Sequence, residues 1–264
     1  MDLEKICNNV IQIATEVGQY VREHIDYHKN NNFEQKGLHD FVTEIDKNSE
    51  KKIITALSKL LPKAGFIAEE QTKTETQDVF NWVVDPIDGT TNFIHGVYPH
   101  AISVALLENN KPILGVVYEI GRNECFYTWE NAPAYCNKKQ IHVSNNKSIA
   151  NSLIATGFPY NDFLRLNEFI KTMEFFMKNA QGIRRFGSAA TDLAYVACGR
   201  FDAFYEYGLK PWDVAAGILL VENAGGKTSD FSGNDTHMFH AEIIASNSYV
   251  YAEFLHTISN IMLQ

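Results

Sequence analysis

Two aspartates, Asp85 and Asp88, lie three residues apart in the segment NWVVDPIDGTTN. The residues before them, Trp82–Val84, are apolar and β-prone, which is typical of a buried strand. Pro86 fixes its own φ and favours an extended conformation for Asp85, and Gly89 allows a sharp turn. We therefore expect both carboxylates to converge on one point beside that turn.

Paired carboxylates repel each other, and each raises the pKa of the other unless a cation lies between them. Mg²⁺ is a suitable cation because it prefers oxygen ligands. The N–H groups of Gly89, Thr90 and Thr91, at a predicted helix N-terminus, could hold a phosphate oxygen against the metal. An isolated Asp-Pro turn with locally capping acids is the alternative. The added Gly-Thr-Thr-Asn favours a metal and phosphate site.

Three more acids occupy positions where a scaffold presents side chains to a site. Asp46 lies at the start of a predicted helix and Glu69 at the end of a short strand, and Asp213 follows the helix-starting Pro211. Each also has a purely structural interpretation. Asp46 would favour the helix dipole behind a Thr43 N-cap, Glu69 would be solvated, and Asp213 would be a buried helix cap.

The elements that must position these acids follow from hydrophobic periodicity and turn residues. Apolar residues at three- and four-residue steps predict a first amphipathic helix from Leu3 to Val21. Further helices are predicted over residues 44–61, 162–178, 189–198, 211–224 and 250–262. Strands are predicted over residues 65–68, 82–84, 101–108, 113–120, 124–130, 140–143, 152–156, 203–207 and 242–246, and the segment 33–42 is predicted to be a hairpin or loop. The middle strands form an antiparallel meander, so the chain is mixed α/β.

The 264 residues are 45% hydrophobic with a formal net charge of −9, which argues against a nucleic-acid or anionic-membrane partner. The four cysteines lack metal-type spacing and are expected to be reduced thiols. The N-terminus lacks a signal-peptide core, and no apolar stretch reaches the length of a membrane span. These features predict a cytoplasmic protein.

Three segments closely resemble motifs of the inositol monophosphatase family, which are Mg²⁺-dependent, lithium-sensitive phosphatases. The segments are FIAEE at residues 66–70, WVVDPIDGTTN at residues 82–92 and WDVAAG at residues 212–217. Their order and separation also match, as do VTEID at residues 42–46 and GSAA at residues 187–190. The resemblance implies a layered α-β-α-β-α sandwich. We divide the chain into an N-terminal half, residues 1–147, with most metal ligands, and a C-terminal half, residues 148–264, packed as one unit.

The resemblance also implies roles for individual residues. Glu69, Asp85 and the Ile87 carbonyl would hold one Mg²⁺, and Asp85, Asp88 and Asp213 a second, with two or three ions in all. Thr90 and Asp46 would orient the attacking water, and Glu69 joins them as a catalytic residue. Substrate contacts would come from Glu69, Ile87, Asp88, Gly89, Thr90, Thr91, Gly187, Ser188, Ala189, Glu206 and Asp213.

The activity implied is hydrolysis of a phosphate monoester, most simply inositol monophosphate to inositol and phosphate. NADP(H), fructose 1,6-bisphosphate and 3′-phosphoadenosine 5′-phosphate remain alternative substrates. A metal-binding regulatory protein without turnover is the non-enzyme alternative. A homodimer and inhibition by lithium are expected from the resemblance alone.

Overall fold

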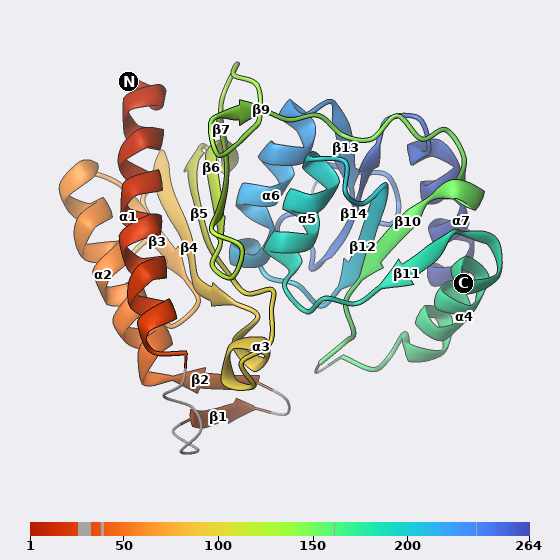
Figure 1. Cartoon of the computed structure of the whole chain (residues 1–264), viewed down its shortest axis with the longest axis horizontal. Coiled ribbons are helices and arrows are strands. Elements are labelled where there is room, and N and C mark those ends of the chain that lie inside the picture. The colour runs from red at the N-terminus through yellow and green to blue at the C-terminus, as the bar shows by residue number, and fades with distance from the viewer. Residues whose placement is uncertain (26–32, 38–39, 161, 236) are drawn as a thin grey trace.

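The computed structural model describes residues 1–25, 33–37, 40–160, 162–235 and 237–264. Helices and two sheets alternate as layers across the molecule (Figure 1). The larger sheet has the strand order β3 (Gly65–Ala68), β4 (Phe80–Asp88), β5 (Ala101–Glu108), β6 (Lys111–Glu119), β7 (Glu124–Trp129), β8 (Tyr135–Cys136) and β9 (Lys139–Gln140). The smaller sheet has the order β11 (Gly182–Arg184), β10 (Leu153–Thr156), β12 (Ala203–Tyr207), β14 (Glu242–Asn247) and β13 (Gly226–Ser229).

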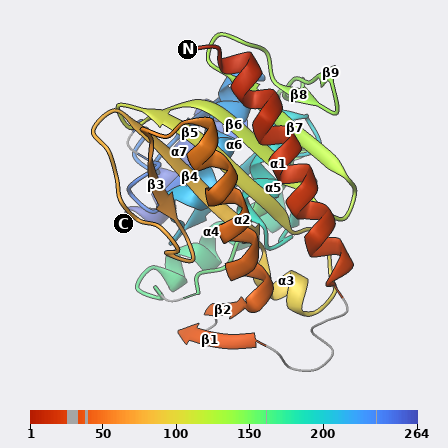
Figure 2. The ribbon, with the colours of Figure 1, turned by 90° about the vertical axis from the view of Figure 1, so that its left-hand side faces the viewer.

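The outer face of the larger sheet is covered by α1 (Leu3–Glu23) and α2 (Glu44–Leu60), which Figure 2 shows lying across it. The buried stripe of α1 includes Val10, Val17 and Val21, as the helical periodicity predicts. These side chains join one core with Trp82 and Tyr118 of the sheet. Burial of each such aliphatic side chain stabilises the fold by about 1.5–3 kcal/mol.

The middle layer consists of α5 (Ala189–Ala197) and α6 (Pro211–Asn223), which lie between the two sheets. Every residue of α5 is buried, and so are residues 214–221 of α6. A helix that is apolar on all sides is expected where both of its faces are covered. This layer brings the N-termini of both helices next to β4.

The outer face of the smaller sheet is covered by α4 (Leu166–Asn179) and α7 (Tyr251–Met262). Phe176 of α4 and Phe254 of α7 contact Tyr205 of β12, with ring centroids 5.7 and 6.0 Å from the tyrosine ring. The complete order is helices, sheet, helices, sheet, helices. The layering implied by the family resemblance is therefore confirmed, together with the antiparallel meander β4-β5-β6-β7.

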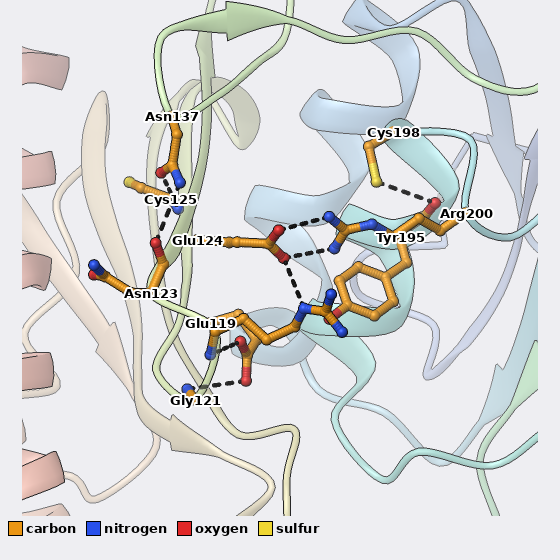
Figure 3. A network of polar contacts seen from close by, with 10 residues as sticks. Glu119, Gly121, Asn123, Glu124, Cys125, Asn137, Tyr195, Cys198 and Arg200 are labelled. Carbon is orange, nitrogen blue, oxygen red and sulfur yellow. Dashed lines mark hydrogen bonds and ion pairs between the residues drawn. The ribbon is translucent and has the colours of Figure 1, made fainter.

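The larger sheet lies within residues 65–140 and the smaller within residues 153–247, one in each half of the division predicted from the sequence. The boundary between residues 147 and 148, near η2 (Ile149–Asn151), stays a prediction. One contact that joins the halves is the ion pair of Glu124 on β7 with Arg200, which follows α5 (Figure 3). In the described ranges, none of the helices has both the length and the apolar composition needed to cross a membrane.

Several predicted boundaries are wrong. The helix expected from Asp162 begins at Leu166, because the Asp162 side chain accepts a hydrogen bond from the Leu164 N–H and holds a turn there. The strand expected over residues 140–143 is observed only as β9, which ends at Gln140. The strands β8, β11 and β13 were not predicted. The hairpin predicted for residues 33–42 is confirmed, because β1 (Phe33–Gly37) and β2 (Asp40–Thr43) pair antiparallel, although β2 extends one residue further. Residues 38–39 lie outside the described residues.

Candidate active site

Four of the predicted acids come together at the end of β4. Carboxylate oxygens of Asp85, Asp88 and Asp213 all lie within 4.8 Å of one another. The side chain of Glu69, which follows β3, is hydrogen-bonded to Asp85. Burial raises the pKa of Asp85 well above its usual range, and the charges of Glu69, Asp88 and Asp213 raise it further. Three remote parts of the chain thus build one acidic cluster, whose oxygen donors could bind a metal ion.

The local backbone of β4 aims the first two acids at this cluster. The β4–β5 register shifts between Asp85, opposite Ser103, and Asp88, opposite Ala101, so β4 carries one extra residue there. The Ile87 N–H donates to Asp85 Oδ1 at 3.0 Å, which fixes that carboxylate. The Ile87 carbonyl, a predicted metal ligand, accepts from the Thr90 hydroxyl at 3.0 Å and keeps a second lone pair.

Asp88 links β4 to the start of α5. Its Oδ2 accepts from the Ser188 hydroxyl and from the Ala190 N–H, both at 2.7 Å. Burial raises the pKa of Asp88 to about 6, and these hydrogen bonds oppose the rise. Both contacts use Oδ2, and a carboxylate oxygen of Asp88 lies within 4.8 Å of carboxylate oxygens of Asp85 and Asp213.

Asp213 lies in the first turn of α6 and is half-buried. Its Oδ2 accepts a hydrogen bond from the Lys210 N–H at 2.6 Å, so Asp213 caps α6 as one of the two interpretations predicted. Burial and the charge of Asp88 raise its pKa to about 7. The capping and metal-ligand interpretations are compatible, because the carboxylate that caps α6 also faces Asp85 and Asp88.

Asp46 and Thr90 form a second part of the site, beside the acidic cluster. The Thr90 hydroxyl lies 3.1 Å from Asp46 Oδ1. Asp46 Oδ2 accepts from the Thr43 N–H at 2.9 Å and from the Thr43 hydroxyl, which completes a capping box for α2. Burial raises the pKa of Asp46, and its bonds with Thr43 and Thr90 oppose the rise. Asp46 therefore both caps its helix and contacts Thr90.

The predicted phosphate-binding turn starts at Gly89, which has a φ of +92° and precedes the short helix α3 (Thr90–Ile94). A Cβ atom at Gly89 would lie 3.0 Å from the Gly187 carbonyl, so the turn packs directly against the loop before α5. The Asn92 side-chain amide donates to the carbonyls of Pro99 and Phe186, both at 2.7 Å, and fastens the two segments together. The first N–H groups of a helix lack intrahelical partners, which suits Thr90 and Thr91 to an anion.

The residues predicted on the alcohol side of the substrate continue this surface. Gly187, Ser188 and Ala189 lead into α5, and Ser188 caps it by accepting from the Thr191 N–H. Glu206 lies on β12 and is only 5% exposed. Burial raises the pKa of Glu206 well above its usual range, with further contributions from Asp192, Asp213 and Asp88. Glu206 therefore shares the electrostatic environment of the acidic cluster.

A close backbone approach leaves room for the Glu206 carboxyl. A Cβ atom at Gly157, after β10, would lie 1.9 Å from the Glu206 carboxyl carbon. Any side chain at Gly157 would thus displace the carboxyl. No sequence signal pointed to this pairing, because Gly157 follows β10 and Glu206 lies on β12, far apart in the sequence.

Three residues of the site were not assigned from the sequence. Asp192 in α5 is 1% exposed, and neither of its carboxyl oxygens has a hydrogen-bond partner among the described residues. Burial raises its pKa well above the usual range, with a contribution from Asp88. Arg185 lies between β11 and α5, and its charge opposes the rise in the pKa values of Asp192 and Glu206. An acid inside an otherwise apolar helix was the available signal for Asp192.

Glu50, on α2, is the third unassigned residue and acts on the strand end that carries Glu69. Its buried carboxylate accepts from the Glu70 N–H at 2.7 Å and from the Thr72 N–H at 2.8 Å. These bonds hold the turn after β3, and so they fix where the Glu69 side chain begins.

The layered fold and the acidic cluster define a class of protein in which carboxylates from several elements surround a site for metal ions. The sequence pattern of the inositol monophosphatase family matches residues 2–263. The chain therefore belongs to the inositol monophosphatase family.

Individual relatives agree with this assignment. The chain is 35% identical over 246 residues to an inositol-1-monophosphatase of Mesorhizobium japonicum, covering 93% of this chain and 92% of that protein. It is 38% identical over 250 residues to the Nus factor SuhB of Escherichia coli, covering 94% and 93%. The crystal structure of the extragenic suppressor protein suhB from Bartonella henselae superimposes with a TM-score of 0.92 at 36% identity, covering 96% and 98%.

Proposed function

We propose that this protein hydrolyses a phosphate monoester in a Mg²⁺-dependent reaction, most directly inositol monophosphate to inositol and phosphate. The observation that carries the proposal is the convergence of Glu69, Asp85, Asp88 and Asp213 beside the Gly89–Thr91 turn. Membership of the family supports the phosphatase class.

The donor set fits Mg²⁺, because all ligands offered are oxygens and the carboxylates repel one another without a cation. Glu69, Asp85 and the Ile87 carbonyl would hold one ion, and Asp85, Asp88 and Asp213 another. A third ion could add to these. When bound, Mg²⁺ neutralises the phosphate, lowers the pKa of a coordinated water and stabilises the leaving alkoxide.

Thr90 and Asp46 are the residues that would position the attacking water. The Thr90 hydroxyl has one hydrogen, which it donates to Asp46 or to the Ile87 carbonyl, and its lone pairs can accept from water. Asp46 is buried, and its raised pKa makes it a stronger base than an exposed carboxylate. Glu69, beside Asp85, would act with them.

The N–H groups of Gly89, Thr90 and Thr91 would bind phosphoryl oxygens, as anions bind at helix N-termini. The alcohol would lie toward the start of α5 and toward Glu206, whose carboxylate can accept hydrogen bonds from hydroxyls. Together, these contacts orient the ester for in-line attack, so no covalent intermediate on the protein is needed.

A substrate panel with phosphate release as the readout tests this proposal. The panel contains inositol 1-phosphate, fructose 1,6-bisphosphate, NADP(H) and 3′-phosphoadenosine 5′-phosphate, each with and without Mg²⁺. We expect Mg²⁺-dependent release that is fastest with inositol 1-phosphate. No release from any member would contradict the proposal, and a faster alternative would replace the substrate while keeping the reaction.

A second candidate role rests on the relatives that carry the name Nus factor, one of them 38% identical over 94% of this chain. Such a role, or that of a metal-binding regulator, needs the fold but not turnover. Complementation of a strain lacking its own Nus factor SuhB separates the two. If Asp85→Asn abolishes hydrolysis and still complements, the second role is independent of the reaction. Complementation would also argue against the expected absence of a nucleic-acid partner.

The expected homodimer, the inhibition by lithium and the cytoplasmic location stay predictions. Light scattering on the purified chain tests the first. A lithium titration of phosphate release tests the second, because a monovalent ion at a metal position would retain the phosphate product.

A further inference from the structure

Arg185 lies beside the predicted phosphate turn, although the reaction proposed above does not use it. The residue occupies the loop between β11 and α5. Its Nη1 lies 2.6 Å from where a Cβ atom of Gly187 would be, and the Gly187 carbonyl packs against Gly89. The guanidinium is therefore separated from the phosphate turn by a single glycine.

Two aromatic residues after β10 hold the guanidinium in place. Its Cζ lies 5.1 Å from the ring centroid of Phe158 and 5.7 Å from that of Tyr160, and Nη2 donates to the Tyr160 hydroxyl at 2.5 Å. Stacking and a hydrogen bond together restrict an arginine far more than either does alone. The buried Nε has no hydrogen-bond partner among the described residues.

The two rings also place Arg185 at the solvent edge of the site. Phe158 is 43% exposed and Tyr160 is 37% exposed, whereas Glu206 and Asp192 behind them are almost fully buried. Large apolar side chains with this exposure beside a buried acidic site are suited to contact a ligand. An arginine that offers five N–H donors has donors left for that ligand.

The charges around Arg185 limit which ligand it can take. Burial raises the pKa values of Asp88, Asp192 and Glu206, and the Arg185 guanidinium opposes each rise. Arg185 therefore lies within electrostatic range of all three acids. Because Asp88, Asp192 and Glu206 already share this one guanidinium, a second phosphate on the substrate would have to compete with them for it. Neutral hydroxyls fit better, since they can accept from Arg185 and donate to Glu206.

We propose that Arg185, held by Phe158 and Tyr160, determines specificity for an uncharged polyhydroxy leaving group by donating to one hydroxyl while Glu206 accepts from a neighbouring one. This inference rests on the proposed function and names the substrate class of the same site. Arg185 is a binding residue here and takes no part in water activation.

Arg185→Met tests the proposal, with Arg184→Met as the matched control. Arg184 is the preceding arginine, is exposed, and donates only to the Ile183 carbonyl in the described contacts. The substrates are inositol 1-phosphate and 4-nitrophenyl phosphate, which has no hydroxyls on its leaving group. We expect Arg185→Met to raise KM for inositol 1-phosphate by about tenfold or more, with kcat changed less than about threefold. The kcat/KM preference for inositol 1-phosphate over 4-nitrophenyl phosphate should fall by about the same factor.

Two further variants sharpen the expected pattern. Tyr160→Phe removes only the hydroxyl that fixes Nη2, so it should lower the preference in the same direction by a smaller factor. Arg185→Lys keeps the charge but loses the planar fork, so it should restore only part of the preference. Arg184→Met should leave both substrates at the wild-type rates.

An equal loss with both substrates would overturn the inference, because Arg185 would then act on the phosphate or on the fold. An unchanged preference would overturn it as well. A larger loss with fructose 1,6-bisphosphate than with inositol 1-phosphate would show that Arg185 binds a second phosphate, which contradicts the neutral class. Wild-type protein that hydrolyses none of these substrates would refute the proposed function itself, and this inference with it.

Discussion

Glu124 and Asp85 belong to two different acidic groups, and their surroundings shift the pKa values of these two side chains in opposite directions. Glu124 of β7 accepts two hydrogen bonds from Arg200, at 2.5 and 2.6 Å (Figure 3). The Arg122 Nε lies 3.5 Å from Glu124 Oε2. This pairing lowers the pKa of Glu124. At the candidate site, by contrast, Asp85 faces three other acids, and its pKa is raised by burial and by their charges.

The two groups differ in where the charge that compensates their carboxylates comes from. The guanidinium of Arg200 stacks 4.6 Å from the ring centroid of Tyr195, and the neighbouring carboxylate of Glu119 accepts from the N–H groups of Gly121 and Arg122. That network is complete within the protein and holds β7 against the end of α5. Among the ion pairs of the described residues, none involves Asp85, Asp88 or Asp213, so we expect the stability and the chemistry of that cluster to depend on a bound cation.

The largest expected effect comes from Asp85→Asn. Removing the shared carboxylate should lower Mg²⁺-dependent phosphate release by about 10³-fold or more, because metal activation is lost. The same change removes a repelled buried charge, so the metal-free protein should become more stable, by roughly 2–4 °C in Tm for each ~1 kcal/mol gained. Phosphate assays and thermal unfolding without Mg²⁺ measure both.

The exposed Asp78 offers the control for that experiment, since Asp78→Asn changes an acid outside both clusters. Its turnover and Tm should match those of the wild type. A metal-free Asp85→Asn protein that is less stable than the wild type would show that this carboxylate is satisfied internally, like Glu124.

Thr90→Val should have the next largest effect. Loss of the hydroxyl that contacts Asp46 should lower kcat by about 10²-fold, the low end of general acid–base contributions, while Mg²⁺ affinity changes little. Thr90→Ser keeps the hydroxyl and should retain most of the activity. Equal losses in both variants would instead implicate the Thr90 methyl group and the packing of α3.

Arg200→Gln should show the opposite pattern from the site variants. We expect a loss of about 1 kcal/mol of unfolding free energy, the upper end for a partly exposed ion pair, because this one is bidentate. Phosphate release per folded molecule should not change. Arg122→Gln is the control, with a smaller loss, since its guanidinium is more exposed and more distant. Lost turnover with an unchanged Tm would contradict the separation of the two clusters.

The smallest expected effect is a pH dependence of Mg²⁺ stabilisation. Asp88 and Asp213, with pKa values of about 6 and 7 when folded, keep protons that the unfolded chain releases near pH 4. Raising the pH from about 4 to 7 therefore destabilises the metal-free protein. Mg²⁺ displaces these protons, so the Tm increase on adding Mg²⁺ should be larger at pH 8 than at pH 5.5.

Glu124 has the opposite pKa shift from Asp88 and Asp213 and therefore the opposite pH dependence. Its lowered pKa means that its contribution to stability is present above the ordinary glutamate pKa and is lost only as the pH falls below it. An equal Tm increase with Mg²⁺ at pH 5.5 and pH 8 would show that Asp88 and Asp213 do not exchange protons for metal.

Much of the fold and part of the acidic cluster could be predicted from local sequence. The Thr43 cap, the Pro211 start of α6 and the strand before Asp85 all follow from short-range preferences and agree with the structure. The convergence of Asp213 with Asp85 does not follow from such preferences. It was expected only from the family resemblance, because the packing of α6 against β4 depends on the whole core.

The parts that were not predicted are contacts between segments far apart in sequence. Arg185 with Tyr160, Gly157 with Glu206 and Glu50 with the turn after β3 leave no periodic or spacing signal. Asp162 shows a different limit. A side chain that suits a helix cap can equally hold a turn before the helix, and the sequence does not distinguish the two.

We propose that Glu69 after β3, Asp85 and Asp88 of β4 and Asp213 of α6 share divalent cations. Calorimetric titration of Mg²⁺ into the wild-type protein and into Asp213→Asn at pH 7 tests it most directly. We expect Mg²⁺ binding with proton release by the wild type, and at least about tenfold weaker binding with less proton release by the variant. Equal affinity and equal proton release in the two proteins would contradict it.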